Sequence, residues 1–147
     1  MLILAVIGGE HGGLLLLTII SSKDDHTFHK IGFTFFVLCS IPRQFITCHM
    51  FARAFTGAMT PLRTLSYQYK YALAVLNTAL VVAAIVAYAY HNTVCTPYVY
   101  SFFALFEWLF VLTNVFFHMG GHLDIADGYA NWTFIIAPVY VEGKLLK

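Results

Sequence analysis

Charged residues are what this sequence has least of. Only 10% of its 147 residues are Asp, Glu, Lys or Arg, whereas 60% are hydrophobic and the mean hydropathy is +0.76. A soluble domain carries roughly 25% charged residues, so this chain has too little polar surface to be stable in water. The composition therefore excludes an ordinary soluble domain and predicts an integral membrane protein.

Low net charge, few cysteines and the absence of known motifs exclude further classes of function. The net charge is only +1, so no basic field favours nucleic acid as a partner. Of three cysteines, Cys39 and Cys48 fall in an apolar run and Cys95 in an expected loop, so no internal disulfide is predicted. The sequence contains no HExxH zinc motif, P-loop, Rossmann fingerprint or nucleophile elbow. It therefore predicts neither a metal site nor a cofactor, and residue spacing alone indicates no reaction.

Long apolar runs dominate what is present. They cover residues 2–20, 31–53, 69–90 and 98–119, each close to the length of about 20 residues that a transmembrane helix requires. The sequence thus predicts an all-α, polytopic membrane bundle with four transmembrane helices in a single domain, residues 1–125. Residues 126–147 are expected to form a cytosolic or interfacial tail, because their apolar stretch WTFIIAPVYV is too short to cross a bilayer.

The distribution of Lys and Arg predicts the orientation. Arg53, Arg63 and Lys70 surround the loop between the second and third runs, which contains no acidic residue, and segment 91–97 contains no Lys or Arg. The positive-inside rule places this middle loop and both termini in the cytosol. Segments 21–30 and 91–97 are then expected on the lumenal side.

The fourth apolar run contains three polar residues on one helical face. At about 100° per residue, Glu107, Asn114 and His118 fall within about 40° of one another. Counting from Tyr98 with a rise of about 1.5 Å per residue, Glu107 lies roughly 14 Å deep. An ionised carboxylate at that depth costs about 2.5–3.5 kcal/mol. It must therefore be protonated, paired, or in contact with a watery cavity.

Possible partners occur at a similar depth in the first two runs. We expect Glu10, Arg43 and Glu107 to form one buried cluster. Two interpretations of the acids stay open, because polar side chains hold membrane helices together and intramembrane acids also mark functional sites. Helix association is favoured for Asn114, and His118 is expected at the cytosolic interface. The first run adds a face of small residues suited to close helix packing, namely Gly8, Gly9, Gly12 and Gly13.

The two expected lumenal segments are rich in polar residues. SSKDDHTFHK supplies Ser22, Asp24 and His29, and HNTVC supplies His91 and Asn92. Such residues are able to form a metal site or an acid–base pair at the membrane surface, although no metal motif is present. For the neighbouring Asp25 and His26, a solvated loop is the favoured interpretation.

Two blocks of the chain resemble a known family. EHGGLLLLTIISSKDDHTFHK and YHNTVCTPYVYSFFALFEWLFVLTNVFFHM are similar to the post-GPI attachment to proteins factor 2 family of the Frag/DRAM/Sfk superfamily, and the likeness covers about residues 10 to 125. Because members of that family are longer, with additional N-terminal spans, the chain is expected to correspond to their C-terminal part. The residues that match the two blocks are Glu10, Ser21, Ser22, Asp24, His29, His91, Asn92, Cys95, Glu107, Asn114 and His118.

The resemblance implies a multi-pass protein of the Golgi and endoplasmic-reticulum membranes. Its function would be fatty-acid remodelling of glycosylphosphatidylinositol (GPI) anchors, in which a lyso-GPI is reacylated with a saturated chain. The implied partners are membrane lipids, GPI-anchored proteins as substrates, and other remodelling enzymes. The acyl donor is not implied, and neither is any established set of catalytic residues.

Roles for the matching residues follow as hypotheses. His29 and His91 are candidate bases at the headgroup level, and Glu107 is a third catalytic candidate. Substrate-binding candidates are Glu10, Ser22, Asp24, Asn92, Asn114 and His118, with Glu10 and Glu107 lining or bracing an acyl cavity. Two alternatives stay open: a non-catalytic lipid-binding or scaffolding subunit that assists a separate acyltransferase, and a transporter or channel. The transporter or channel is less favoured because only one or two helices carry a sustained polar stripe and no inverted repeat is visible.

Overall fold

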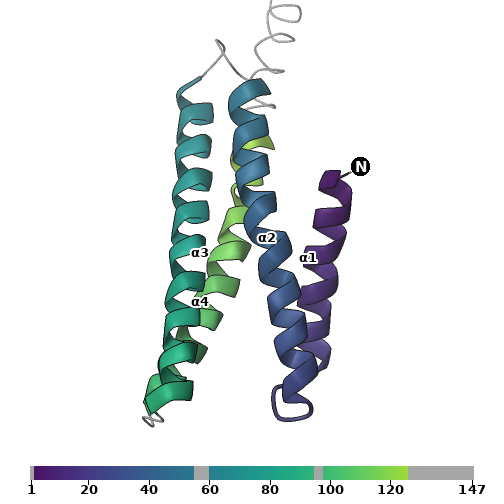
Figure 1. The fold of residues 1–147 in the computed structure, drawn as a ribbon. Helices are drawn as coiled ribbons and strands as arrows, with labels where there is room; N and C mark the ends of the chain where they lie inside the picture. Colours follow the sequence, from purple (N-terminus) through teal and green to yellow (C-terminus); the bar gives the residue numbers. More distant parts are fainter. Residues whose placement is uncertain (1, 55–59, 95–97, 126–147) are drawn as a thin grey trace, which may run out of the picture.

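The computed structural model describes residues 2–54, 60–94 and 98–125, and their regular structure is entirely helical (Figure 1). The helices are α1 (Leu2–Ile19), α2 (His26–Ala54), α3 (Pro61–Val94) and α4 (Val99–Met119). Three of them are long and apolar enough to cross a membrane, α4 together with its continuation to Ile125, and α1 is a shorter apolar helix of 18 residues. The predicted all-α membrane bundle is confirmed.

Two helices extend beyond the predicted apolar runs. α2 begins at His26 rather than at residue 31, because Asp25 Oδ1 accepts hydrogen bonds from the backbone N–H groups of Thr27 (2.8 Å) and Phe28 (3.1 Å). This is an N-cap, and hydropathy does not detect it. As a result, the histidine and lysine that end the segment 21–30 lie on the first turns of a helix and not in a loop.

The third helix is longer than predicted at both ends. It starts at Pro61 rather than at residue 69 and ends at Val94 rather than at residue 90. Thr60 caps its start by accepting a hydrogen bond from the N–H of Arg63 at 3.2 Å, and proline suits the first helical position. Hydropathy therefore locates the apolar centre of the helix, whereas capping residues set its start. The predicted tail, residues 126–147, lies outside the described residues, as does Cys95.

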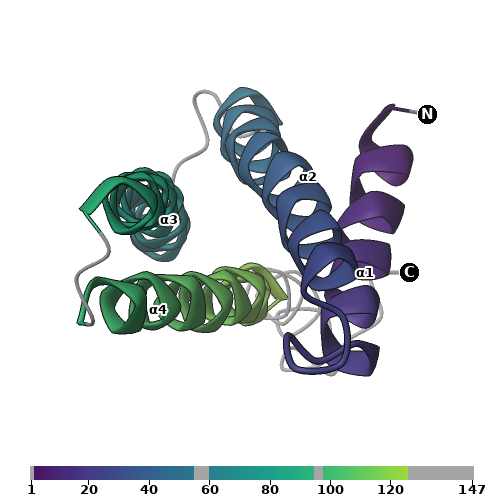
Figure 2. The same ribbon diagram turned by 60° about the horizontal axis from the view of Figure 1, so that its bottom comes forward.

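The helices alternate in direction and pack as two pairs. α1 packs along α2, and α3 packs along α4, while α2 also contacts α3 (Figures 1 and 2). The end of α1 and start of α2 lie at the same end of the bundle as the end of α3 and start of α4, at the bottom of Figure 1. The two segments predicted to be lumenal therefore share one end. Which side of the membrane that end faces stays a prediction.

Close packing of α1 on α2 depends on two of the four glycines of the predicted small face. A Cβ atom on Gly13 would lie 2.7 Å from the backbone nitrogen of Phe36, and one on Gly9 would lie 2.6 Å from Cys39 Sγ. Gly8 and Gly12 have nothing within 4 Å. The spacing Gly9-xxx-Gly13 is thus the part that brings the two backbones together.

Polar residues occupy much of the interior. Gln44 and Asn77 are 0% exposed and Glu10 is 2% exposed, whereas large apolar side chains such as Leu4 and Trp108 point outward. This pattern suits a lipid environment, in which burying apolar side chains gains little and contacts between polar groups favour association.

Candidate functional site

A buried ion pair joins the first two helices. Glu10 of α1 and Arg43 of α2 are 2% and 6% exposed, and their side chains make a direct salt bridge. Glu10 Oε1 also accepts hydrogen bonds from Arg43 Nη2 at 3.0 Å and from Asn114 Nδ2 at 2.9 Å. His118 Nε2 lies 3.3 Å from the same oxygen. Glu10 is therefore surrounded by partners from two other helices.

The ion pair belongs to a network that reaches all four helices. Asn114 Oδ1 accepts hydrogen bonds from Arg43 Nη2 at 3.3 Å and from Gln44 Nε2 at 2.7 Å. Gln44 Oε1 in turn accepts one from Asn77 Nδ2 of α3 at 3.1 Å, and Thr113 Oγ1 donates to Asn77 Oδ1. We call these residues the central network: Glu10, Arg43, Gln44, Asn77, Thr113, Asn114 and His118. Its members satisfy one another, which is the arrangement expected of helix association.

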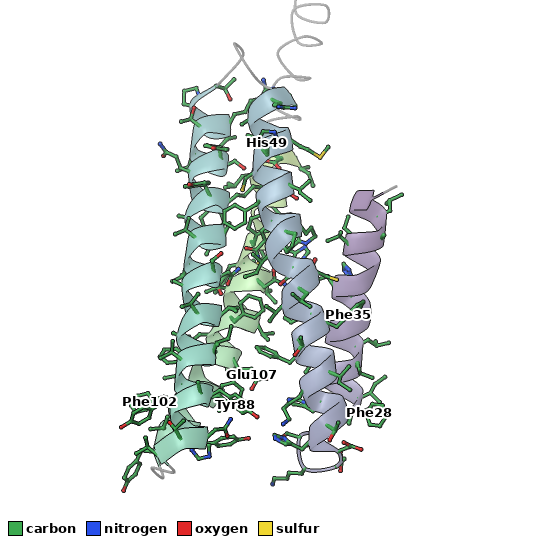
Figure 3. All side chains as sticks on the ribbon, in the orientation of Figure 1. Phe28, Phe35, His49, Tyr88, Phe102 and Glu107 are labelled. Carbon is green, nitrogen blue, oxygen red and sulfur yellow. The ribbon has the colours of Figure 1, made fainter. Side chains whose placement is uncertain are left out.

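A cavity lies between α2, α3 and α4. Its volume is about 440 Å³, within the range of roughly 300–1,000 Å³ typical of small-molecule sites. It lies at the end where α1 turns into α2, and Figure 3 shows Glu107 and Tyr88 pointing from α4 and α3 toward the start of α2. We call it the lipid cavity, because its lining combines polar and apolar residues as the two ends of a lipid do.

The lining changes from polar to apolar with depth. Residues near the start of α2 and the end of α3 are polar: Ser22, His26, His29, Lys30 and Tyr88. Residues further along the helices are mostly apolar, with Thr34 and Glu107 as the polar exceptions: Phe33, Val37, Leu38, Val81, Ala84, Ile85, Phe103 and Ala104. A polar mouth above an apolar interior matches the two ends of a lipid, with a headgroup at the surface and an acyl chain below.

An imidazole and a carboxylate face each other inside this cavity. His29 Nε2 lies 3.8 Å from Glu107 Oε1, and both side chains are 21% exposed. His29 Nδ1 lies 2.9 Å from the carbonyl oxygen of Ile20. A carbonyl only accepts, so Nδ1 is the donor and the neutral ring has its lone pair on Nε2. Because 3.8 Å exceeds hydrogen-bond length, this lone pair is available to a third group.

The mouth contains further polar contacts between elements. Lys30 Nζ donates to the Tyr88 hydroxyl at 3.3 Å, which links α2 to α3. Ser22 Oγ lies 3.3 Å from His26 Nδ1. Tyr100 lines the cavity and contacts Phe103, with ring centroids 5.9 Å apart. These residues place donors and aromatic rings where a headgroup would enter.

The structure divides the predicted site residues into three groups. It brings His29, Glu107 and Ser22 together around the lipid cavity. Asn114 and His118 join Glu10 in the central network, where the exposed side chain of His118 contacts Glu10 and Arg43. The place of His118 at the membrane interface stays a prediction. Glu10, Asn114 and His118 also line a smaller pocket of about 250 Å³ between α1 and α4. The expected single cluster is wrong in one member, because Glu107 pairs with His29 and not with Arg43.

The remaining predicted residues do not line the lipid cavity. Asp24 accepts a hydrogen bond from the N–H of Ser21 at 3.3 Å within the turn before α2. His91 packs against Tyr100, with ring centroids 5.5 Å apart, and Asn92 lies one helical turn after Tyr88 on α3. Both therefore lie near residues of the mouth without lining the cavity themselves.

Several residues at these two sites are not predicted from the sequence. The sequence pattern indicates a loop for Lys30 and the membrane interface for Tyr88, and it places Asn77 and Gln44 within apolar runs. Asn77 is the clearest omission, since it is a single amide within the apolar run 72–87, and a lone polar residue in such a run needs a partner. Recognising Asp25 as a cap would also place Lys30 on a helix.

The chain is similar in sequence to several known proteins. The family described as Frag1/DRAM/Sfk1/Cwh43P N-terminal domain matches residues 1–128. The chain belongs to this family. Within it, the chain is 36% identical over 114 residues to Acyltransferase PGAP2 of Xenopus tropicalis, covering 78% of this chain and 45% of that protein. It is 38% identical over 119 residues to Post-GPI attachment to proteins factor 2 of Caenorhabditis elegans, covering 78% and 44%.

A third relative extends the matched region. Post-GPI attachment to proteins factor 2 of Caenorhabditis briggsae is 31% identical over 144 residues, covering 90% of this chain and 53% of that protein. The resemblance to this family is thus confirmed. The chain spans about half the length of these curated relatives. No solved structure matches it.

Proposed function

We propose that this chain acts in the remodelling of GPI-anchor lipids in Golgi and endoplasmic-reticulum membranes, by reacylating a lyso-GPI with a saturated fatty acid. The observation that carries the proposal is the His29–Glu107 pair inside a cavity with a polar mouth and an apolar interior. The name of one relative, Acyltransferase PGAP2, supports the reaction class, and the names of others support a link to GPI attachment.

The chemistry begins with proton abstraction. His29 Nε2 takes the proton from the free glycerol hydroxyl of the lyso-lipid, and the resulting oxygen attacks the carbonyl carbon of the acyl donor. The bond from the carbonyl to the donor's leaving group then breaks, and the imidazolium returns its proton to that group. The carboxylate of Glu107, 3.8 Å from the same nitrogen, stabilises the imidazolium in between by its negative charge, while the carbonyl oxygen of Ile20 accepts a hydrogen bond from Nδ1. The products are the diacylated lipid and the protonated leaving group.

The cavity supplies the other two requirements of acyl transfer. Its apolar wall, between α2 and α3, accommodates the acyl chain and keeps water away from the reacting carbonyl. Its polar mouth, near His26 and Ser22, accommodates the inositol phosphate end. GPI-anchored proteins then extend from the mouth into the lumen, which agrees with the predicted orientation.

A reconstituted assay tests the proposal. The full chain in lipid nanodiscs is incubated with lyso-GPI and a labelled saturated acyl donor, and diacylated product is measured. We expect turnover that His29→Asn lowers by about 10²- to 10⁴-fold, the usual contribution of a general base. His49→Asn is the matched control, since His49 lies on the same helix at its opposite end (Figure 3). Binding of lyso-GPI without turnover would instead identify a scaffolding subunit.

A further inference from the structure

The mouth of the lipid cavity holds a cation that the proposed proton transfer does not use. Lys30 follows His29 directly on α2, and its Nζ lies 3.3 Å from the Tyr88 hydroxyl and 5.7 Å from the centre of that ring. Among the residues that the structure describes, no carboxylate lies within ion-pair distance of this ammonium. A positive charge at the edge of an apolar cavity is therefore left without an anion.

The charged groups around the mouth leave room for an anion. The one carboxylate among the lining residues is Glu107, and it faces His29. His26 adds a second imidazole at the rim, beside Ser22. An ammonium, a phenol and a serine hydroxyl are all hydrogen-bond donors, and such a set suits phosphate oxygens.

We infer that Lys30 and Tyr88 bind the phosphate of an anionic lysophospholipid and thereby hold its free glycerol hydroxyl beside His29. This inference rests on the proposed function and names the group by which that site selects its lipid. Phosphate and glycerol hydroxyl lie only a few bonds apart in such a lipid. Lys30 and His29 both line this cavity, so a phosphate bound at Lys30 places the hydroxyl within reach of His29.

A simpler role for Lys30 would be attachment to the membrane surface. A lysine near an anionic bilayer gains about 1 kcal/mol wherever it lies, and long side chains reach the interface easily. Lys23 provides the matched control, because it lies in the segment between α1 and α2 at the same end of the bundle and does not line the cavity. Surface attraction predicts similar effects for the two lysines, whereas a phosphate site predicts an effect for Lys30 alone.

The test measures binding without any acyl donor. The full chain in neutral nanodiscs is titrated with lysophosphatidylinositol and, separately, with monoacylglycerol of the same chain length, which lacks the phosphate. We expect Lys30→Gln to weaken binding of lysophosphatidylinositol about tenfold or more, as for a hydrogen bond to a charged group, and to leave monoacylglycerol unchanged. Tyr88→Phe should weaken the same lipid by about threefold. Lys30→Arg should retain binding, and Lys23→Gln should have no effect.

Three outcomes would overturn the inference. Equal losses for Lys30→Gln and Lys23→Gln would indicate surface attraction, and equal losses for the two lipids would indicate a damaged cavity. Full competition by soluble inositol phosphate or inorganic phosphate, at concentrations equal to those of the lipid, would indicate a site for a free anion. The test measures binding and not turnover. A selective loss of lipid binding in Lys30→Gln therefore supports the phosphate site even if no acyl transfer is found. Acyl transfer, in turn, supports the proposed function even if this selectivity is absent.

Discussion

Glu10 and Glu107 are both carboxylates within membrane-spanning helices, yet the structure surrounds them differently. Glu10 is 2% exposed and has Arg43, Asn114 and His118 as partners. Glu107 has a side chain that is 21% exposed, lines a cavity, and faces one imidazole at 3.8 Å. A carboxylate paired with an arginine and with several other donors holds helices together, whereas one that faces a single imidazole across a larger cavity has acceptor positions left for a ligand.

The difference also concerns which helices each region joins. The central network ties α1 to the other three helices, and α1 otherwise packs mainly on α2. The lipid cavity lies between the two helix pairs and is bounded by α2, α3 and α4. Changes in the central network should therefore reduce stability first, and changes in the cavity should reduce activity first.

The largest expected effect is loss of the buried ion pair. Arg43→Met leaves the Glu10 carboxylate without its cation, and an uncompensated buried charge costs about 3–5 kcal/mol. We expect this loss in the free energy of unfolding, measured by titration with sodium dodecyl sulfate in mixed micelles. The double variant Glu10→Gln with Arg43→Met should recover more than half of it, since no buried charge remains. Equal stability of Arg43→Met and the unchanged protein would contradict the assigned role.

In the lipid cavity we expect a substitution to reduce acyl transfer and to leave stability almost unchanged. Glu107→Gln removes the negative charge beside His29, so acyl transfer should fall by about 10²-fold, the lower end of the usual contribution of acid–base groups. Its free energy of unfolding should change by less than about 0.5 kcal/mol, since no buried partner is left unpaired. Turnover is measured in nanodiscs, and stability is measured by the same detergent titration as for Arg43→Met. A stability loss as large as that of Arg43→Met would erase the distinction between the two glutamates.

Much of the central network could be predicted from the sequence, and less of the lipid cavity could. Depth along each helix places Glu10 and Arg43 at one level, and the structure confirms their contact. Depth does not specify rotation about the helix axis, however, so the sequence wrongly predicts Glu107 in the same cluster. Its actual partner, His29, depends on where α2 begins, and that depends on the Asp25 cap and not on hydropathy.

Substitutions in the glycine face of α1 test how closely α1 packs against α2. Gly13→Val should push α1 away from α2, because the new side chain would meet the backbone of Phe36; overpacking of this kind costs about 1–3 kcal/mol. Gly12→Val is the control, since a Cβ atom at that position would have nothing within 4 Å. Unfolding in the same detergent titration should separate the two variants. If Gly12→Val were the more damaging, the face that packs against α2 would be assigned wrongly.

The smallest expected effect on stability comes from removing a single threonine hydroxyl, either in the central network or in the lipid cavity. Thr113 Oγ1 donates to Asn77 Oδ1 in the central network, whereas Thr34 is exposed on the wall of the lipid cavity. Valine has nearly the shape of threonine, so Thr113→Val removes the donor and leaves the Asn77 carbonyl short of a partner. Hydrogen bonds between membrane helices contribute about 0.6 kcal/mol on average and up to about 1.7. We expect a loss in that range for Thr113→Val and almost none for Thr34→Val, with acyl transfer unaffected by Thr113→Val. A larger loss for Thr34→Val would mean that the cavity wall, and not the network, stabilises the bundle.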